Sequence, residues 1–354
     1  AFVAEAQDWA AGECCQEYDT PEDLGPLVQA DVRRLLVEAV DDRAFERVFP
    51  RYIPRYLGSI VKQHEAAQEE NIPYLSLSAS VAPLAAGRGV PETAASVDVQ
   101  ELIGQTRASG GVLLLRGDAG SGKTYSLRMA VYEAAREALA LPPERRRNPM
   151  LPVPVLVSLA NYQRVPDVQP HEEILSLVAR ALRQHGFPPV LTLDKARRFL
   201  TTQRFCFCFD GLNEIAEGDL RYAVTALRDF VARHPNEGMV FTARSHFLER
   251  RRDLWERTLG GQCATLDDLA LHQLRDYLAS GFLDEEAVQQ IGDKLSDPDT
   301  FTLAQKPLFL FVLIKTITRL GEARVTKGSL LGQFVDMALA MDLREKASYV
   351  NQLS

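Results

Sequence analysis

The octapeptide GDAGSGKT, residues 117–124, decides how the chain around it folds. It follows an apolar, β-prone run, GVLLLR, and precedes a segment whose apolar residues recur at helical spacing. Those residues are Leu127, Ala130, Val131 and Ala134. The glycine loop therefore joins a strand to a helix, which is the setting that a phosphate-binding loop requires.

The loop matches the pattern G-x-x-x-x-G-K-[ST]. Where no Cβ blocks the approach, successive amides of such a loop can converge on phosphate oxygens, and the following helix adds its positive N-terminal end. We expect Lys123 to bridge β- and γ-phosphate oxygens and Thr124 to be a ligand of Mg²⁺. The alternative is a turn whose glycines only end a strand. The nucleotide-binding residues predicted here are Gly117, Asp118, Ala119, Gly120, Ser121, Gly122, Lys123, Thr124 and Tyr125.

A second segment, RFCFCFDGLNEI at residues 204–215, supplies the acidic residue that such a loop needs beside it. With a period of two, the phenylalanines point to one face of a sheet, while the two cysteines and Asp210 point to the other. Both faces are covered, and the small thiols let a helix approach closely. Asp210 emerges at the carboxyl end of the strand, where α/β sheets place ligands, and its oxygens suit Mg²⁺. The alternative is an aspartate that only ends a strand in a turn.

Glu214 comes four residues after Asp210 and is suited to orient and deprotonate an attacking water. The alternative is a solvated acid beside a helix. The residues of these two segments therefore predict Lys123, Asp210 and Glu214 as catalytic and Thr124 and Asp210 as metal ligands.

Strand and helix patterns alternate through the middle of the chain. The alternation predicts an α/β fold class, the three-layer α/β/α core of a P-loop NTPase with a mostly parallel sheet. The strand at 153–159 lies between the loop and Asp210 segments, which fits the division of P-loop proteins that inserts a strand there and uses a catalytic glutamate. No N-K-x-D guanine signature occurs, so adenine is the expected base. Strands are expected at 112–116, 153–159, 205–210, 239–243 and 263–266, and helices at 123–139, 172–185, 194–201 and 220–234.

Composition shifts divide the chain into five regions. Pro50 and Pro54 are expected to break the second region into short helices, and only helical patterns follow residue 267. The regions are a polar tail (1–25), a helical N-terminal region (26–81), a linker (82–96), the P-loop core (97–267) and a helical lobe (268–354).

The net charge and the cysteine content narrow the kinds of partner and site that the chain is expected to have. The 354 residues carry a net charge of -8, so no global pull toward nucleic acid or acidic membranes exists. Two basic runs, at 144–148 and 249–253, are flanked by acids and are expected to be solvated faces. The longest apolar run of the C-terminal half, at 307–314, is far too short to span a bilayer. Five scattered cysteines form no dense disulfide framework, and the CFC pair fits buried thiols better than a metal site. We expect a cytoplasmic protein, with neither a membrane nor a nucleic acid as its partner.

These segments together resemble the NACHT ATPases of the STAND class of signalling NTPases, particularly their prokaryotic members. The resemblance rests on LLLRGDAGSGKT, on FCFCFDGLNEI with its selective D-G-h-x-E form, on MVFTARSHF and on LPVPVLVSLANY, and it covers residues 97–340. It implies an ATP/ADP switch with Mg²⁺ that hydrolyses slowly. In such a switch the ATP state promotes self-association and effector activation, in response to a trigger ligand that the sequence does not name.

The resemblance also carries residue roles to matching positions. The strand ending in TAR is the first sensor of that family, so Thr242 and Arg244 are carried over, with Arg244 near the γ-phosphate and among the catalytic residues. Pro307 matches a lobe proline that borders the nucleotide, and it can also serve as the first residue of a helix. The alternative for Arg244 is a surface arginine in an ion pair.

Two departures from the family pattern matter. Asn213 stands where many relatives carry aspartate, which removes any second acidic role there. The winged-helix and sensor segments are not recognisable, so we interpret the chain as the nucleotide switch of a larger protein, truncated before them. The alternatives are a motor or loader ATPase that works on nucleic acid, suggested by the two basic runs, and a small-molecule kinase.

Overall fold

The computed structural model describes most of the chain between residues 49 and 320. The expected tail, the start of the helical N-terminal region, most of the linker and nearly all residues beyond 320 lie outside the described residues, as do Cys14 and Cys15. The described residues are 49–67, 73–83, 96–146, 148–165, 168–187, 191–251, 255, 259–320 and the single residues 328, 332 and 335.

A mostly parallel sheet of seven strands forms the centre of the molecule, as the alternation predicts. Its order is β2-β1-β7-β3-β6-β5-β4. The strands from β7 to β4 are parallel, whereas β1 pairs antiparallel with β7 and with β2. The strands are β1 (Ser78–Pro83), β2 (Ser96–Asp98), β3 (Gly111–Gly117), β4 (Val153–Ser158), β5 (Phe205–Asp210), β6 (Gly238–Arg244) and β7 (Gln262–Leu266).

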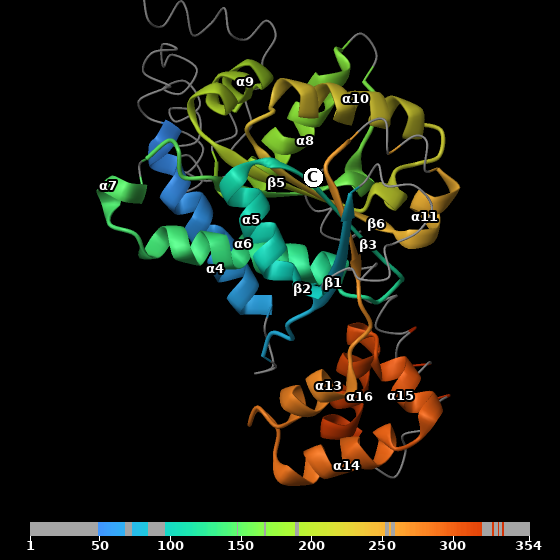
Figure 1. The fold of residues 1–354 in the computed structure, drawn as a ribbon. Coiled ribbons are helices and arrows are strands. Elements are labelled where there is room, and N and C mark those ends of the chain that lie inside the picture. The colour runs from blue at the N-terminus through green and yellow to red at the C-terminus, as the bar shows by residue number, and fades with distance from the viewer. Residues whose placement is uncertain are drawn as a thin grey trace, which may run out of the picture.

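Helices cover both faces of this sheet and make the three layers of the expected α/β/α core (Figure 1). One layer contains α4 (Ile53–Ala67), α5 (Val99–Ser109) and α6 (Lys123–Ala140). The other contains α8 (Pro170–Gln184), α9 (Leu193–Thr202) and α10 (Leu220–Arg233). The shorter helices are η2 (Phe49–Tyr52), α7 (Pro143–Arg146), η3 (Leu159–Asn161), η4 (Leu212–Glu214) and α11 (Ser245–Arg250).

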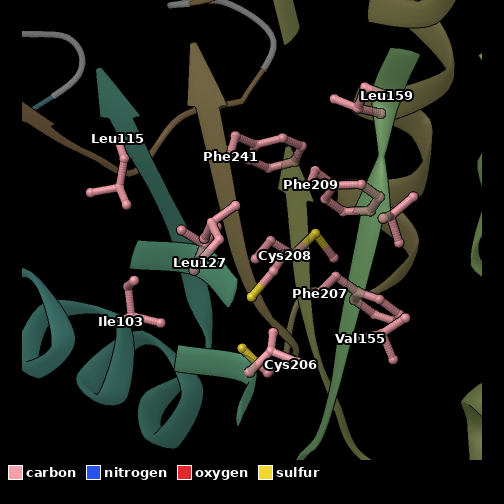
Figure 2. Close-up of a cluster of buried hydrophobic side chains, with 14 of the residues drawn as sticks. Ile103, Leu115, Leu127, Val155, Leu159, Cys206, Phe207, Cys208, Phe209 and Phe241 are labelled. Atoms are coloured by element: carbon pink, nitrogen blue, oxygen red, sulfur yellow. The ribbon is translucent and has the colours of Figure 1, made fainter. Parts of the chain in front are cut away.

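Strand β5 has the predicted two-faced pattern. Figure 2 shows Phe207 and Phe209 on one side of the strand and the thiols of Cys206 and Cys208 on the side of Leu127 in α6. On the aromatic side, Phe207 and Phe209 both meet the ring of Phe230 in α10 edge-on. The thiols are buried, so they pack as small apolar groups and let α6 approach the strand.

The strand that separates the glycine loop from the acidic strand in space is β6, not β4. Strand β6 pairs with β3 on one side and with β5 on the other, while β4 pairs with the far side of β5. The extra strand predicted between the two motifs is therefore present, but the assignment of 153–159 to it is wrong. Sequence order does not fix strand order in a parallel sheet, because each crossover helix can carry the chain past its neighbour.

The sheet begins before residue 97, where the sequence places the start of the core. Strand β1 begins within the region expected to be helical and ends in the expected linker, and β2 begins at the last residue of that linker. Helix α4 also belongs to the core, because Tyr56 is buried and its hydroxyl donates a 2.8 Å hydrogen bond to the carbonyl of Pro154 in β4. Of the two predicted breaks, Pro54 is the second residue of α4 and starts that helix.

After β7 the described chain is helical, as expected, and forms a separate lobe (Figure 1). Asp284 and Asp297 cap α14 and α15 by accepting hydrogen bonds from the amides of Ala287 and Thr300. Buried residues of α16 such as Leu310 and Leu313 fill the centre of the lobe, which explains the apolar run at 307–314. The lobe helices are α13 (Leu271–Leu278), α14 (Glu285–Leu295), α15 (Pro298–Ala304) and α16 (Pro307–Leu320).

Among the described residues, no single helix is long and apolar enough to cross a membrane. Helices α15 and α16 reach the required length and composition only together, and a bend of 115° separates them.

Candidate nucleotide-binding site

The glycine loop lies between the end of β3 and the start of α6, as predicted. Gly120 and Gly122 have φ values of 78° and 92°, which favour glycine. A Cβ on Gly117 would lie 2.5 Å from the hydroxyl oxygen of Ser121, so that position also needs glycine. Asp118, Ala119 and Tyr125 are exposed, and the remaining loop residues are buried or half-buried. The loop thus presents backbone amides at the positive end of a helix of 18 residues.

Lys123 extends across the mouth of this loop. Its ammonium donates hydrogen bonds to the carbonyls of Gly117 (2.8 Å) and Asp118 (2.6 Å). Burial and, after it, the guanidinium of Arg244 lower the pKa of Lys123 to about 8, against the raising effect of Asp210 and Asp118. A half-buried cation with another cation near it is stabilised by an anion placed between them.

Asp210 is held at the end of β5 by two hydroxyl groups. Its Oδ1 accepts hydrogen bonds from Thr242 (2.5 Å) in β6 and from Thr124 (3.2 Å) in α6. The Thr242 hydroxyl also accepts a 2.8 Å hydrogen bond from the amide of Gly211. Thr124 and Asp210 therefore place a hydroxyl and a carboxylate oxygen side by side, which is a donor set that fits Mg²⁺. Thr242 acts in this geometry as the residue that orients Asp210.

Glu214 lies in the short helix η4 directly after Asp210, and its side chain is exposed. Gly211 has a φ of 82°, and a Cβ on it would lie 2.6 Å from Oε2 of Glu214. The carboxylate of Glu214 is thus folded back over Gly211 toward the end of β5. Glycine is required at position 211 because its φ is positive and because a Cβ there would collide with the carboxylate of Glu214.

Arg244 is exposed at the end of β6, in register with Gly117 of the loop. Its amide donates a 3.0 Å hydrogen bond to Oδ1 of Asn213. Asn213 therefore ties the ends of β5 and β6 together, a role that sequence reasoning missed because it treated this residue only as the loss of an acid.

The helical lobe contacts the loop directly. Pro307 is the first residue of α16, and a Cβ on Gly122 would lie 3.6 Å from its Cγ. The amide of Leu308 donates a 3.2 Å hydrogen bond to the carbonyl of Gly120, and Lys306 forms an ion pair with Asp118. Lys306 and Leu308 are further residues of the site that the sequence did not reveal, because these contacts join segments far apart in the chain.

Tyr125 packs outside the loop against a segment that precedes β1. Its ring stacks on Tyr74 with 5.3 Å between centroids, and the side chain of Gln100 donates hydrogen bonds to the Tyr74 hydroxyl and to the carbonyl of Ser126. The structure therefore gathers the predicted residues of the glycine loop, the acidic motif and the TAR strand end at the carboxyl ends of β3, β5 and β6, with Pro307 reaching them from the lobe and Tyr125 lying outside the loop.

Other candidate sites from the sequence receive less support. Within the described ranges, no three histidine, cysteine or acidic side chains are grouped so that they could hold a metal. Arg146 in the first basic run caps α6 through the carbonyls of Leu139 and Leu141. Arg251 in the second run pairs with Glu217. At least these two arginines are engaged within the protein.

No protein-family model matches the chain, and no curated protein matches its sequence. Among solved structures, it is similar to a Walker-type ATPase of Pyrococcus abyssi at 14% identity, over 72% of this chain and 75% of that one, with a TM-score of 0.43. It is similar to the Aeropyrum pernix ORC1 protein, solved in complex with DNA, at 17% identity over 68% and 64%, with a TM-score of 0.40. Saccharomyces cerevisiae RIF2 is similar at 11% identity over 82% and 95%, with a TM-score of 0.31. Likenesses at this level carry no function, and the fold rests on the chain's own strand order, glycine loop and acidic strand end, which are those of a P-loop NTPase.

Proposed function

We propose that this chain is an ATP-dependent switch that binds ATP with Mg²⁺ and hydrolyses it slowly. One observation supports this proposal more strongly than any other. The first turn of α16 contacts Gly120 and Gly122 of the loop that would cradle the phosphates. Because the lobe and the core meet at that point, a ligand whose affinity differs between two arrangements of the lobe would shift the balance between them.

The roles of the core residues follow from their positions. The loop amides and Lys123 would bind the phosphates, and Arg244 would approach the γ-phosphate from the end of β6. Thr124 and Asp210 would hold Mg²⁺, which when bound neutralises charge on the β- and γ-phosphate oxygens. Glu214 would orient and deprotonate the attacking water. Tyr125 and Pro307 would border the nucleotide outside the loop.

The more specific part of the proposal is a NACHT-type switch of the STAND class, working in the cytoplasm as part of a larger protein. The acidic motif DGLNE and the TAR strand end support it, and the loop–lobe contact gives a route by which ATP would expose an assembly surface. The proposed domains are those expected from the sequence, with the core enlarged by α4 and β1. Self-association in the ATP state and an unnamed trigger ligand belong to the same proposal.

Hydrolysis assays with and without nucleic acid separate this switch from a loader ATPase. We expect slow turnover that neither DNA nor RNA stimulates. Glu214→Gln should retain ATP but lose about 10²- to 10⁴-fold in rate, since that is the usual contribution of a general base. Asp210→Asn should instead weaken the Mg²⁺-dependent part of binding. Turnover that rises on addition of DNA and binding that falls steeply with salt would favour the loader.

A further inference from the structure

Lys306 links the helical lobe to the glycine loop through two ion pairs. Its ammonium lies 3.2 Å from Oδ2 of Asp118, in the loop, and 2.5 Å from Oδ1 of Asp268, in the segment between β7 and α13. The Lys306 side chain is 23% exposed and that of Asp118 is 66% exposed, so the lysine is the more enclosed partner.

The backbone around Lys306 holds its ammonium in this place. Lys306 directly precedes α16, and the amide of Leu308 donates to the carbonyl of Gly120. A Cβ on Gly120 would lie 3.3 Å from Cβ of Leu308, so the start of α16 sits tightly on the loop. The backbone of Lys306 can therefore move away from the loop only if the start of α16 moves as well.

The carboxylate of Asp118 would repel phosphates bound in the loop, and the ammonium of Lys306 counters this repulsion. A carboxylate in a phosphate-binding loop repels a triphosphate, and the repulsion grows with the number of phosphate charges. Partial burial lowers the pKa of Lys306, but its bonds to Asp268 and Asp118 outweigh this effect and raise the pKa. Lys306 therefore keeps its proton, and its one positive charge, shared with Asp268, offsets part of the charge of Asp118.

We propose that Lys306 is a positioning residue of the nucleotide site, which offsets part of the charge of Asp118 and ties the lobe to the phosphate loop. This inference rests on the proposed function, because it presumes that the loop binds a nucleotide. It assigns a role to a residue outside the loop and the acidic motif.

A double-mutant cycle on the whole chain tests the proposal. ATP and ADP are titrated against the wild type, Lys306→Gln, Asp118→Asn and the variant that carries both changes. Lys306→Gln should weaken ATP binding by about 5- to 10-fold, as expected for one uncompensated charge near several phosphate charges, and ADP binding by less. Asp118→Asn should strengthen ATP binding, because it removes a repelling carboxylate, and the double variant should bind ATP as wild type does to within about twofold, since it loses one charge of each sign. Lys306→Arg, which keeps the charge, should retain ATP affinity.

Lys294→Gln removes a lysine from the last turn of α14 and serves as the matched control, with unchanged affinity expected. A double variant that binds ATP as weakly as Lys306→Gln alone would overturn the proposal, because removal of the Asp118 carboxylate would then not relieve the loss of the lysine. Equal losses for ATP and ADP would overturn it too, since a merely structural defect does not depend on phosphate charge. If the wild type binds no nucleotide, the proposed function fails first, and this inference fails with it.

Discussion

At the scale of single residues, the site is organised around Asp210 by side chains that also satisfy the backbone. Thr242 donates to Asp210 and accepts from Gly211, and it is buried. Asn213 accepts from the amide of Arg244. Polar groups fixed in this way hold the ends of two strands in one geometry, so the carboxylate needs little rearrangement to bind a cation.

Lys123 gives a prediction about protons. Its pKa is lowered to about 8, first by burial and then by Arg244. Bound phosphates would raise the pKa, so above about pH 8 the free protein has lost a proton that the complex regains. ATP affinity should therefore fall with rising pH, by at most about tenfold per pH unit, until the pKa of the complex is reached.

Calorimetric titration at pH 9 in two buffers of different ionisation enthalpy measures this uptake. Wild type should take up close to one proton per ATP. Lys123→Arg is the control, because a guanidinium stays protonated at this pH and should take up none. Identical uptake by both proteins would show that Lys123 is not the group that titrates.

At the scale of elements, sequence patterns predicted what local periodicity determines. The alternation in FCFCFD predicted which residues lie on each face of β5 and where that strand begins and ends. The spacing of apolar residues predicted the ends of α6 and α10 to within one residue. Local periodicity did not reveal β1, because its sequence, SASVAP, is short and rich in small residues and pairs with strands that lie elsewhere in the chain. The position of β6 between β3 and β5 was missed for a similar reason, because strand order is a property of the whole sheet.

Helix α4 supplies a test of how far the core extends toward the N-terminus. Tyr56→Phe removes the donor to the Pro154 carbonyl without changing the ring, so a buried acceptor loses its partner. The free energy of unfolding should fall by about 1–3 kcal/mol in urea denaturation. Tyr222→Phe is the control, since that side chain is 47% exposed, and it should change stability by less than about 0.5 kcal/mol. Equal stability of Tyr56→Phe and wild type would show that α4 is not docked on β4 in this way.

At the scale of the whole molecule, the lobe completes the site. Lys306 and Asp118 are 188 residues apart in the chain, and their ion pair brings the lobe onto the phosphate loop. The sequence predicted a site shared by a core and a lobe, on the basis of one proline and a family resemblance. It could not show which lobe atoms touch the loop, because such long-range contacts depend on how the whole lobe packs.

A nucleotide bound in the loop is expected to fix how the lobe sits on the core, and limited proteolysis tests this most directly. Wild type and Lys123→Ala are digested with and without a nonhydrolysable ATP analogue. We expect the analogue to slow cleavage of the wild type at residues 267–273 and near Lys306. Lys123→Ala should show no protection, because it loses the loop's only cationic side chain. Cleavage of the wild type at the same rate with and without the analogue would contradict the claim, and so would equal protection of a folded Lys123→Ala variant.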